Sequence, residues 1–483
     1  IDLPQEVSSS VYERMRTERL RLARELRARG RELAEGIRAD ADRQRTVILA
    51  DAFREAETLR GEGDARYLRD VSVPAHRGMI VDRYGEPLAI STPVDSVWVN
   101  PQLFQPSHEQ QKQLAKKLNI KRKKIGKLSS GRNRGREFAY LKRHVSPDVV
   151  RQVTALGIKG VFLQREYHRY YPKGEVTGHV IGFTNIDDKG QEGLELAYDD
   201  WLRGVKGKKR VLKDRLGRVV ENVESIKESD PGKVLRLSID RRIQYLANRE
   251  LKAAVRRHGA KSGSLVLLDI QTGEVLAMVN QPSYNPNNRG ALRSSKYRNR
   301  AVTDVIEPGS TIKPFIIAAA LESNRFKPET VIDTSPGLLR VGSHVVRDHR
   351  NYGRIDLATI IQKSSNVGAT KIALKLESQT IWDVMTRVAF GYSSGSGFPG
   401  EASGLLTHYS GWNKIEQATL SFGYGLSVTP LQLARAYSAL AGDGNLRPVS
   451  FLKLEDSPQA EEIVQVFQPE TTRIVRGMLE KVV

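Results

Sequence analysis

One stretch near the middle of the chain constrains its fold most strongly. Residues 264–281 form two apolar runs separated by Thr272 and Gly273, a pattern that predicts a β-hairpin. Helical patterns follow the hairpin at residues 311–322, 357–376 and 430–441. A hairpin succeeded by several helices is typical of an α+β domain.

The length of the chain and the spacing of its patterns indicate three parts. A chain of 483 residues exceeds what one ordinary hydrophobic core organises, so two or three domains are expected. We predict a long helix over residues 1–62, an elongated β-rich domain over 66–230 with a basic head region at about 105–165, and the α+β domain over 231–483. No apolar run approaches the roughly 20 residues that cross a bilayer.

Residues 1–62 follow a helical pattern with an unusual period. Ser10 and Glu13 have the spacing of a capping box, and Gly61 and Gly63 end the pattern. Spacings of four and seven residues alternate along one seam of this helix, at Val11, Met15, Leu22, Leu26, Leu33, Ile37, Gln44 and Ile48. This eleven-residue repeat gives a nearly straight seam that a second copy of the helix can cover. The alternative is a single amphipathic helix that lies on its own domain.

The formal charge of +21 is unevenly distributed along the chain. Residues 1–65 contain thirteen Arg and fourteen acidic residues, whereas the basic excess is densest between Lys112 and Arg143. This basic stretch is either a solvated surface or a site for anionic partners. No nucleic-acid recognition motif accompanies it, so we expect no nucleic acid as partner. The chain has no Cys, which excludes thiolate chemistry, and no metal-ligand spacing, so no cofactor or metal is expected.

The residues best suited to chemistry lie in the sequence EPGSTIKPF, residues 307–315. Ser310 opens a predicted helix, and Lys313 lies one turn later on the same face. In a partly dry pocket the pKa of Lys313 falls, so its free amine can take the proton of the Ser310 hydroxyl. The later sequence KSSNVG adds Ser364, whose hydroxyl can relay a proton, and Asn366, whose amide can orient Lys313 and a substrate. These four side chains predict a serine acyltransferase-type enzyme.

With these motifs, residues from about 66 to 483 closely resemble the class B penicillin-binding proteins, in particular the division transpeptidases of the FtsI type. The stretches at residues 77–82, 165–172 and 192–193 match the non-catalytic pedestal motifs of that family. The resemblance implies a penicillin-binding, serine β-lactamase-like transpeptidase domain on an elongated pedestal domain. The long helix precedes these two domains, and the fold as a whole belongs to the α+β class.

The resemblance also implies an activity, a serine-type D,D-transpeptidase of septal peptidoglycan synthesis. It implies Ser310 as the acylated nucleophile, Lys313 as its base and Ser364 as the proton shuttle. Substrate contacts are implied for Ser310, Ser364, Asn366 and Tyr424. The implied partners are D-Ala-D-Ala stem peptides, β-lactams, division proteins including a septal glycosyltransferase, and the membrane through an anchor outside this sequence. The implied location is the periplasmic face of the bacterial inner membrane.

One motif of that family is missing from the printed sequence. The family carries K-[ST]-G on a strand after the S-x-N motif, and no such triplet follows Asn366. Residues 261–263 spell the triplet but precede Ser310, and we interpret them as coincidental. We therefore expect a C-terminally incomplete sheet and little or no activity of a polypeptide that ends at Val483. The alternative enzyme is a serine β-lactamase-like hydrolase, although its E-x-x-L-N motif is not found.

Residues 1–65 resemble a different family. The stretch from IDLPQEVSSSVYERMR to LRGEGDA is similar to the coiled-coil part of HflC-like stomatin and prohibitin membrane scaffolds. That resemblance implies self-association through residues 1–62 and no catalysis in this part. A non-catalytic membrane scaffold is therefore a third functional hypothesis, although it leaves Ser310 and its partners unexplained. Because the transpeptidase family has a membrane anchor at this place, the sequence also indicates two separate parts joined near residues 63–65.

Overall fold

The structure is a computed structural model that describes residue 17 and residues 34–52, 67–130, 135–213, 219–290, 296–455 and 463–482. The chain divides into two compact units. The first unit comprises residues 1–73 and 208–228, and the second comprises residues 74–207 and 229–483. Within the described residues, no helix has both the length and the apolar composition needed to cross a membrane.

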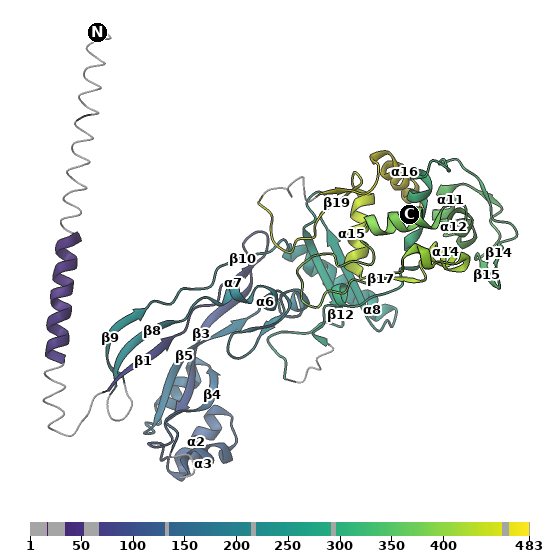
Figure 1. The fold of residues 1–483 in the computed structure, drawn as a ribbon. Coiled ribbons are helices and arrows are strands. Elements are labelled where there is room, and N and C mark those ends of the chain that lie inside the picture. Colours follow the sequence, from purple (N-terminus) through teal and green to yellow (C-terminus); the bar gives the residue numbers. More distant parts are fainter. Residues whose placement is uncertain are drawn as a thin grey trace, which may run out of the picture. The chain divides into compact units, whose positions relative to one another are not determined.

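The first unit contains a helix and a three-stranded sheet (Figure 1). Residues 34–52 are helical, and most of the helix predicted over residues 1–62 lies outside the described residues. Two positions of its eleven-residue seam, Ile37 and Ile48, are 70% and 58% exposed in the single chain, so self-association through this helix stays a prediction. The sheet has the order β1 (Tyr67–Val73), β8 (Gly207–Lys213) and β9 (Val219–Lys227).

The second unit begins with a five-stranded sheet. Its strands are β2 (Ile80–Val81), β3 (Pro87–Val99), β4 (Ala139–Val145), β5 (Val161–Tyr170) and β10 (Leu235–Arg236). The long strand β3 pairs antiparallel with β2, β4 and β5, while β10 joins β2 in parallel. A turn that includes Tyr84 and Gly85 connects β2 to β3.

Three helices cover one face of this sheet and form a small core. They are α2 (His108–Leu118), α3 (Arg122–Ser129) and α4 (Pro147–Thr154), and Figure 1 shows α2 and α3 below β4. Their buried aliphatic residues pack against Val97 and Val99 of β3. Because successive side chains of a strand point to opposite faces, the burial of Val97 and Val99 directs Trp98 to the other face of the sheet.

A second core joins this sheet to the α+β part of the same unit. It includes Ile80 and Leu88 from the sheet, Leu194, and Val275 and Met278 from the predicted hairpin. The connecting elements are η2 (Gly174–Val176), α5 (Gly178–Ile181), β6 (Phe183–Thr184), β7 (Gly190–Glu192), α6 (Gly193–Ala197) and α7 (Asp199–Arg203). The shared core explains why residues 74–207 and 229–483 form one compact unit.

Four charged side chains pair with one another beneath this sheet. Arg77 contacts Glu195 and Asp199 at 2.7 Å each, and Arg169 contacts Glu195 at 2.6 Å. All four side chains are buried, with Glu195 fully enclosed. Two guanidinium groups therefore pair with two carboxylates. Such pairing is needed because an unpaired charge in the interior is strongly destabilising.

The hairpin predicted at residues 264–281 is present. Strand β11 (Gly263–Leu268) pairs antiparallel with β12 (Val275–Gln281), and among the described residues β11 pairs with no other strand. Helix α8 (Arg241–Arg257) packs on this hairpin through Ala247, which shares a cluster with Ala277 and Val279.

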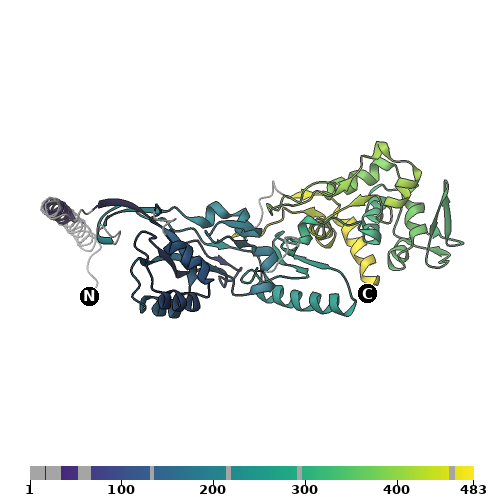
Figure 2. The same cartoon turned by 90° about the horizontal axis from the view of Figure 1, so that it is seen from below.

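Helix α10 (Lys313–Glu322) is the centre of a third and larger core. Residues 313–320 of this helix are all buried, so the helix is apolar on every side and is surrounded by other helices. The helices of this part are α9 (Arg300–Thr303), α11 (Leu357–Gln362), α12 (Asn366–Ala373), α13 (Ser378–Arg387), α14 (Lys414–Leu420), α15 (Pro430–Ala441) and α16 (Pro469–Leu479). In Figure 2 the green and yellow part of the chain, which contains α11 to α16, lies at one end of the unit.

Short strands and 3-10 turns complete this part. The strand pairs are β13 (Ile332–Asp333) with β16 (Arg354–Ile355), β14 (Leu338–Val341) with β15 (His344–Arg347), β17 (Leu405–Leu406) with β18 (Leu426–Ser427), and β19 (Asn445–Leu446) with β20 (Val464–Gln465). The turns are η4 (Gly309–Ile312), η5 (Tyr409–Gly411) and η7 (Glu480–Val482).

The single helical stretch predicted over residues 357–376 is wrong in one respect. The structure has two helices there, α11 and α12, separated by residues 363–365. Ser364 in this break has a φ of 54°, a left-handed conformation that cannot continue an α-helix. The hydroxyl of Ser365 then caps α12 by accepting a hydrogen bond from the Gly368 N–H at 2.8 Å.

Candidate active site

Ser310 and Lys313 lie at the beginning of the central helix. Ser310 belongs to the 3-10 turn η4, and α10 continues directly from Lys313. Pro314 occupies the first turn of α10, where the missing N–H costs little. The Lys313 Nζ lies 3.0 Å from the Ser310 Oγ, so the two side chains that were predicted to share a face are in hydrogen-bond contact.

The break between α11 and α12 brings Ser364 and Asn366 to the same amine. The Lys313 Nζ lies 2.6 Å from the Ser364 backbone oxygen, 3.0 Å from the Ser364 Oγ and 2.8 Å from the Asn366 Oδ1. The left-handed φ of Ser364 turns both oxygens of that residue toward Lys313. The structure therefore places all four predicted side chains together, although 53 residues separate Lys313 from Asn366.

The four oxygens around the Lys313 Nζ can all be satisfied by an uncharged amine. The Ser364 backbone oxygen and the Asn366 Oδ1 can only accept hydrogen bonds, whereas the two serine hydroxyls can also donate. An ammonium has only three N–H groups for these four oxygens. A neutral amine donates its two N–H groups to the two carbonyl oxygens and keeps a lone pair for a hydroxyl proton. The arrangement therefore suits proton transfer from Ser310 to Lys313.

Burial favours the uncharged form of Lys313. The side chain is 1% exposed, and among the described residues no carboxylate is one of its hydrogen-bond partners. Desolvation lowers the pKa of Lys313 to about 8, against a smaller opposing effect of the Asp348 carboxylate. About half of the amine is thus uncharged near pH 8, where a free lysine is almost fully protonated.

The loop that carries Tyr424 lies against the turn of Ser310. The Gly309 N–H donates to the Gly423 oxygen at 3.2 Å, and a Cβ on Gly423 would lie 2.0 Å from the Gly309 oxygen. Gly423 also has a φ of 86°, so this close approach requires glycine. The Tyr424 side chain itself is 52% exposed, and within the described residues it makes no hydrogen bond to the four predicted catalytic side chains.

Two family profiles match this chain. Residues 72–237 match the penicillin-binding protein dimerisation domain, and residues 263–483 match the penicillin-binding protein transpeptidase domain. The second match contains the Ser310 site, and the first contains the five-stranded sheet and the buried ion pairs.

Two relatives match most of the chain. The peptidoglycan D,D-transpeptidase FtsI of Escherichia coli K12 is 44% identical over 431 residues, which cover 88% of this chain and 72% of the relative. The chain belongs to the class B penicillin-binding proteins. The probable peptidoglycan D,D-transpeptidase PenA of Neisseria meningitidis is 43% identical over 429 residues, with the same coverage. Within its family this penicillin-binding protein is thus a serine-type peptidoglycan D,D-transpeptidase of the FtsI and PenA type, associated with cell division.

Solved structures of penicillin-binding proteins have the same fold. Penicillin-binding protein 3 of Mycobacterium tuberculosis, solved in complex with aztreonam, is 25% identical and covers 85% of this chain and 76% of its own, with a TM-score of 0.63. Penicillin-binding protein 2X of Streptococcus thermophilus covers 86% of this chain and 66% of its own at 23% identity, with a TM-score of 0.67. This penicillin-binding protein therefore has a transpeptidase domain preceded by a dimerisation domain, as the α+β prediction with a pedestal stated.

One residue of the site in this penicillin-binding protein was missed by the sequence analysis. Asp348 follows β15, and its carboxylate accepts hydrogen bonds from the Ser365 Oγ at 2.6 Å and from the Val367 N–H at 2.9 Å. It therefore fixes the turn that presents Ser364 and Asn366. The neighbouring Arg347 oxygen accepts from the Asn366 Nδ2 at 3.2 Å, which leaves the Asn366 Oδ1 facing Lys313. A lone aspartate after a short hairpin carries no motif that could have indicated this contact.

The triplet at residues 261–263 lies elsewhere in this penicillin-binding protein. Gly263 begins β11 and pairs with Gln281 at the end of the hairpin. Ser262 and Gly263 line a cavity of about 540 Å³ together with Tyr437, whose hydroxyl donates to the Thr311 oxygen at 2.7 Å. No described hydrogen bond joins the triplet to Ser310, Lys313, Ser364 or Asn366.

Proposed function

We propose that the natural protein that contains this chain cross-links peptidoglycan stem peptides that end in D-Ala-D-Ala, through an acyl-enzyme on Ser310. The single observation that carries this assignment of roles is the contact of the buried Lys313 Nζ with the Ser310 Oγ at 3.0 Å. The complex of the M. tuberculosis relative with aztreonam supports β-lactams as inhibitors of this chain as well.

In the first half-reaction, Lys313 takes the hydroxyl proton while the Ser310 Oγ bonds to the carbonyl carbon of the penultimate D-Ala. When the tetrahedral adduct collapses, the C–N bond to the terminal D-Ala breaks, and the Ser364 hydroxyl relays the proton from Lys313 to the leaving amine. The products are free D-Ala and an ester on Ser310.

In the second half-reaction, an amine of a neighbouring stem peptide attacks the ester carbonyl. The amine loses one proton to the Lys313 and Ser364 pair, the ester C–O bond breaks, and Ser310 recovers its hydroxyl proton. Asn366 holds Lys313 in place through its Oδ1, and one N–H of its amide remains for the substrate. The exposed ring of Tyr424 contacts the bound stem peptide in this proposal.

We further propose that the reaction takes place at the periplasmic face of the bacterial inner membrane during septum formation. The support for this is the 44% identity to the E. coli division transpeptidase FtsI. The proposed protein partners are division proteins, including a septal glycosyltransferase that supplies the glycan.

Intact-mass analysis of the full-length natural protein after incubation with a penicillin tests the proposed nucleophile. We expect one β-lactam adduct per chain, located on Ser310 by peptide mapping, and no adduct in Ser310→Ala. Ser323→Ala, at the other end of α10, is the matched control and should be acylated normally. An adduct on another residue would contradict the proposal, and fast continuous turnover of nitrocefin would favour the β-lactamase-like alternative.

A further inference from the structure

One face of strand β5 is lined by side chains that the reaction at Ser310 does not use. Side chains of a strand alternate between faces, so five residues of β5 share one face: Phe162, Gln164, Glu166, His168 and Tyr170. On the opposite face Val161 packs against the core formed with α2, α3 and α4, whereas Leu163 and Arg165 farther along β5 are exposed. Over the eight residue steps from Phe162 to Tyr170, an extended strand advances about 26 Å.

Aromatic rings occupy the Phe162 end of this face. Trp98 is in register with Phe162 on β3, and their rings are stacked with centroids 4.6 Å apart. The ring of Phe138 lies 4.7 Å from that of Trp98, and Phe138 is 43% exposed. None of these three rings belongs to a hydrophobic core of the described residues. Trp98 and Phe162 are half-buried and Phe138 is exposed, so the three rings lie at the surface rather than in the interior.

The centre of the face is polar. Arg143 pairs with Glu166 at 2.9 Å, and the Tyr140 hydroxyl donates to the same carboxylate at 2.8 Å. Next to it, the Nδ1 atoms of His144 and His168 lie 3.0 Å apart, so at most one of the two can carry a proton there. The Gln164 Oε1 lies 3.4 Å from the Tyr140 hydroxyl oxygen, whose proton is directed to Glu166, and the Gln164 amide nitrogen has no protein partner in the described part of the chain.

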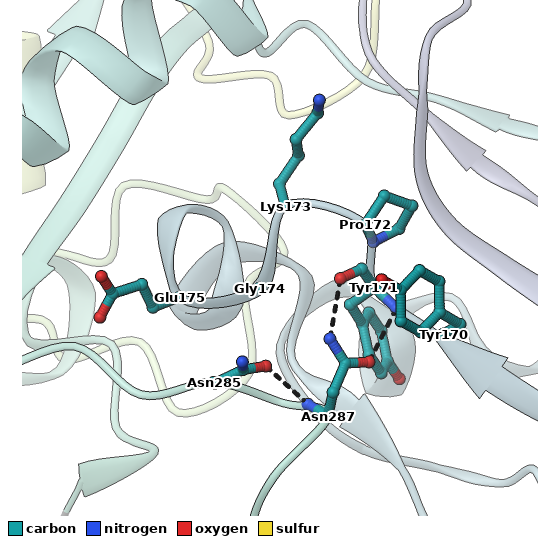
Figure 3. Close-up of a pocket in the computed structure, with 8 residues that line it drawn as sticks. All are labelled: Tyr170, Tyr171, Pro172, Lys173, Gly174, Glu175, Asn285 and Asn287. Atoms are coloured by element: carbon teal, nitrogen blue, oxygen red, sulfur yellow. Dashed lines mark hydrogen bonds between the residues drawn. The ribbon is translucent and has the colours of Figure 1, made fainter.

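A cavity of about 390 Å³ lies at the Tyr170 end, lined by Tyr170, Lys173, Glu175, Asn285 and Asn287 (Figure 3). Two hydrogen bonds to the backbone of Tyr171 fix Asn287. The Asn285 Oδ1 accepts from the Asn287 N–H at 2.9 Å, which leaves the Asn285 amide nitrogen available. Figure 3 shows Lys173 extended away from Glu175, and its ammonium has no ion-pair partner among the described residues.

This combination identifies the chemistry of the ligand. Exposed rings at both ends offer flat apolar surfaces to the C–H faces of sugar rings, and free amide groups can bind hydroxyl and acetamido groups. The ionised Glu166 disfavours a nucleic-acid phosphate backbone, and the polar centre disfavours insertion into a bilayer. The length of the face suits an extended chain rather than a single small molecule.

We propose that this face of β5, from the Trp98, Phe138 and Phe162 rings to the Tyr170 cavity, binds the amino-sugar backbone of peptidoglycan. Lys173 pairs with a carboxylate of a stem peptide attached to that glycan. The inference rests on the proposed function, because it assigns the glycan part of the same substrate to a surface outside the Ser310 site.

Titration of the full-length protein with a neutral oligosaccharide of β-linked N-acetylglucosamine tests the glycan surface. We expect saturable binding by calorimetry and a shift of the Trp98 indole N–H signal, which Trp98→Phe assigns while keeping a ring at this position. The double variant Phe138→Ala and Tyr170→Ala should bind at least tenfold more weakly, and a thermal melt verifies its folding. Tyr245→Ala, an exposed tyrosine of α8 outside this face, should bind like the wild type.

A second ligand tests the cavity. Lys173→Ala should bind the neutral oligosaccharide normally but bind soluble glycan strands that carry stem peptides several-fold more weakly. If wild-type protein that is acylated on Ser310 fails to bind the oligosaccharide, or if the Trp98 signal does not move, the glycan surface is refuted and the proposed function stands. If the oligosaccharide binds but Ser310 is not acylated, the proposed function fails instead.

Discussion

Two buried cations in the second unit have opposite surroundings. Lys313 and Arg77 are each 1% exposed. The hydrogen-bond partners of the Lys313 Nζ are hydroxyl and carbonyl oxygens, without a carboxylate. Arg77 instead forms ion pairs with Glu195 and Asp199. The two cations are therefore equally buried, but only the charge of Arg77 is compensated by carboxylates.

The partners of each cation determine the direction in which its pKa shifts. Desolvation lowers the pKa of both cations, but at Arg77 the carboxylates of Glu195 and Asp199 outweigh it and raise the pKa. At Lys313 desolvation prevails, because the nearby Asp348 carboxylate opposes it only weakly. A buried cation with neutral partners is ready to exchange a proton, whereas one held by two carboxylates is fixed in its charge.

The largest expected effect is on the rate of acylation in Lys313→Met. Without the amine, the rate constant for β-lactam acylation of Ser310 should fall by about 10³-fold, in the middle of the range for general-base catalysis. The thermal midpoint should stay the same or rise, because a buried charge without a counter-ion is removed. Lys375→Met, an exposed lysine of the same domain, is the control. Acylation at more than a tenth of the wild-type rate would remove Lys313 from the proposed base role.

Arg77→Met should have the opposite signature, a loss of stability. The substitution leaves Glu195 and Asp199 buried, with only Arg169 to compensate them, so the free energy of unfolding should fall by about 3–5 kcal/mol. Denaturant unfolding measures this change. Arg151→Ala, which removes an ion pair with Asp148 whose two side chains are more than 70% exposed, should cause no measurable loss. Equal effects of both variants would show that burial does not distinguish these pairs.

The pH dependence of acylation sharpens the comparison further. Since the uncharged form of Lys313 is the proposed base and its pKa is about 8, the rate constant should rise about tenfold per pH unit below pH 8 and level off above it. Stopped-flow acylation of the wild type between about pH 6 and pH 10, about two pH units on either side of the midpoint, measures this. A rate constant that does not change with pH around pH 8 would contradict the proposal that Lys313, with its pKa lowered by desolvation, is the base.

Asp348→Asn should produce the smallest effect. Removal of this carboxylate removes the charge that raises the pKa of Lys313, so the midpoint of the pH profile should move to lower pH by less than about one unit. The plateau rate should also fall, because Ser365 and Val367 lose a charged acceptor. Asp333→Asn, an exposed carboxylate on β13, is the control. A midpoint that moves upward would show that Asp348 acts on Lys313 in another way.

Much of the fold followed from local patterns in the sequence. The hairpin at residues 264–281 and the helix at residues 430–441 are present as predicted, because a turn signal between apolar runs and a Thr-Pro helix start act within a few residues. The break within residues 357–376 was not predicted, because the apolar pattern of α11 and α12 is continuous across it. In the structure, Ser364 contacts Lys313, and the next residue, Ser365, contacts Asp348, so the break depends on residues far from it in the chain.

The sequence by itself determined which residue types are available for chemistry and their local order: a serine and a lysine one turn apart, then a serine and an asparagine one residue apart. It also determined the helix that carries the first pair, since turn and helix signals are local. Only the tertiary structure decided that the two pairs meet, that Asp348 supports them, and that Lys313 lacks a carboxylate partner while Arg77 has two. Desolvation and Coulomb interactions depend on distance in space, and neighbours in space come from residues far apart in the chain.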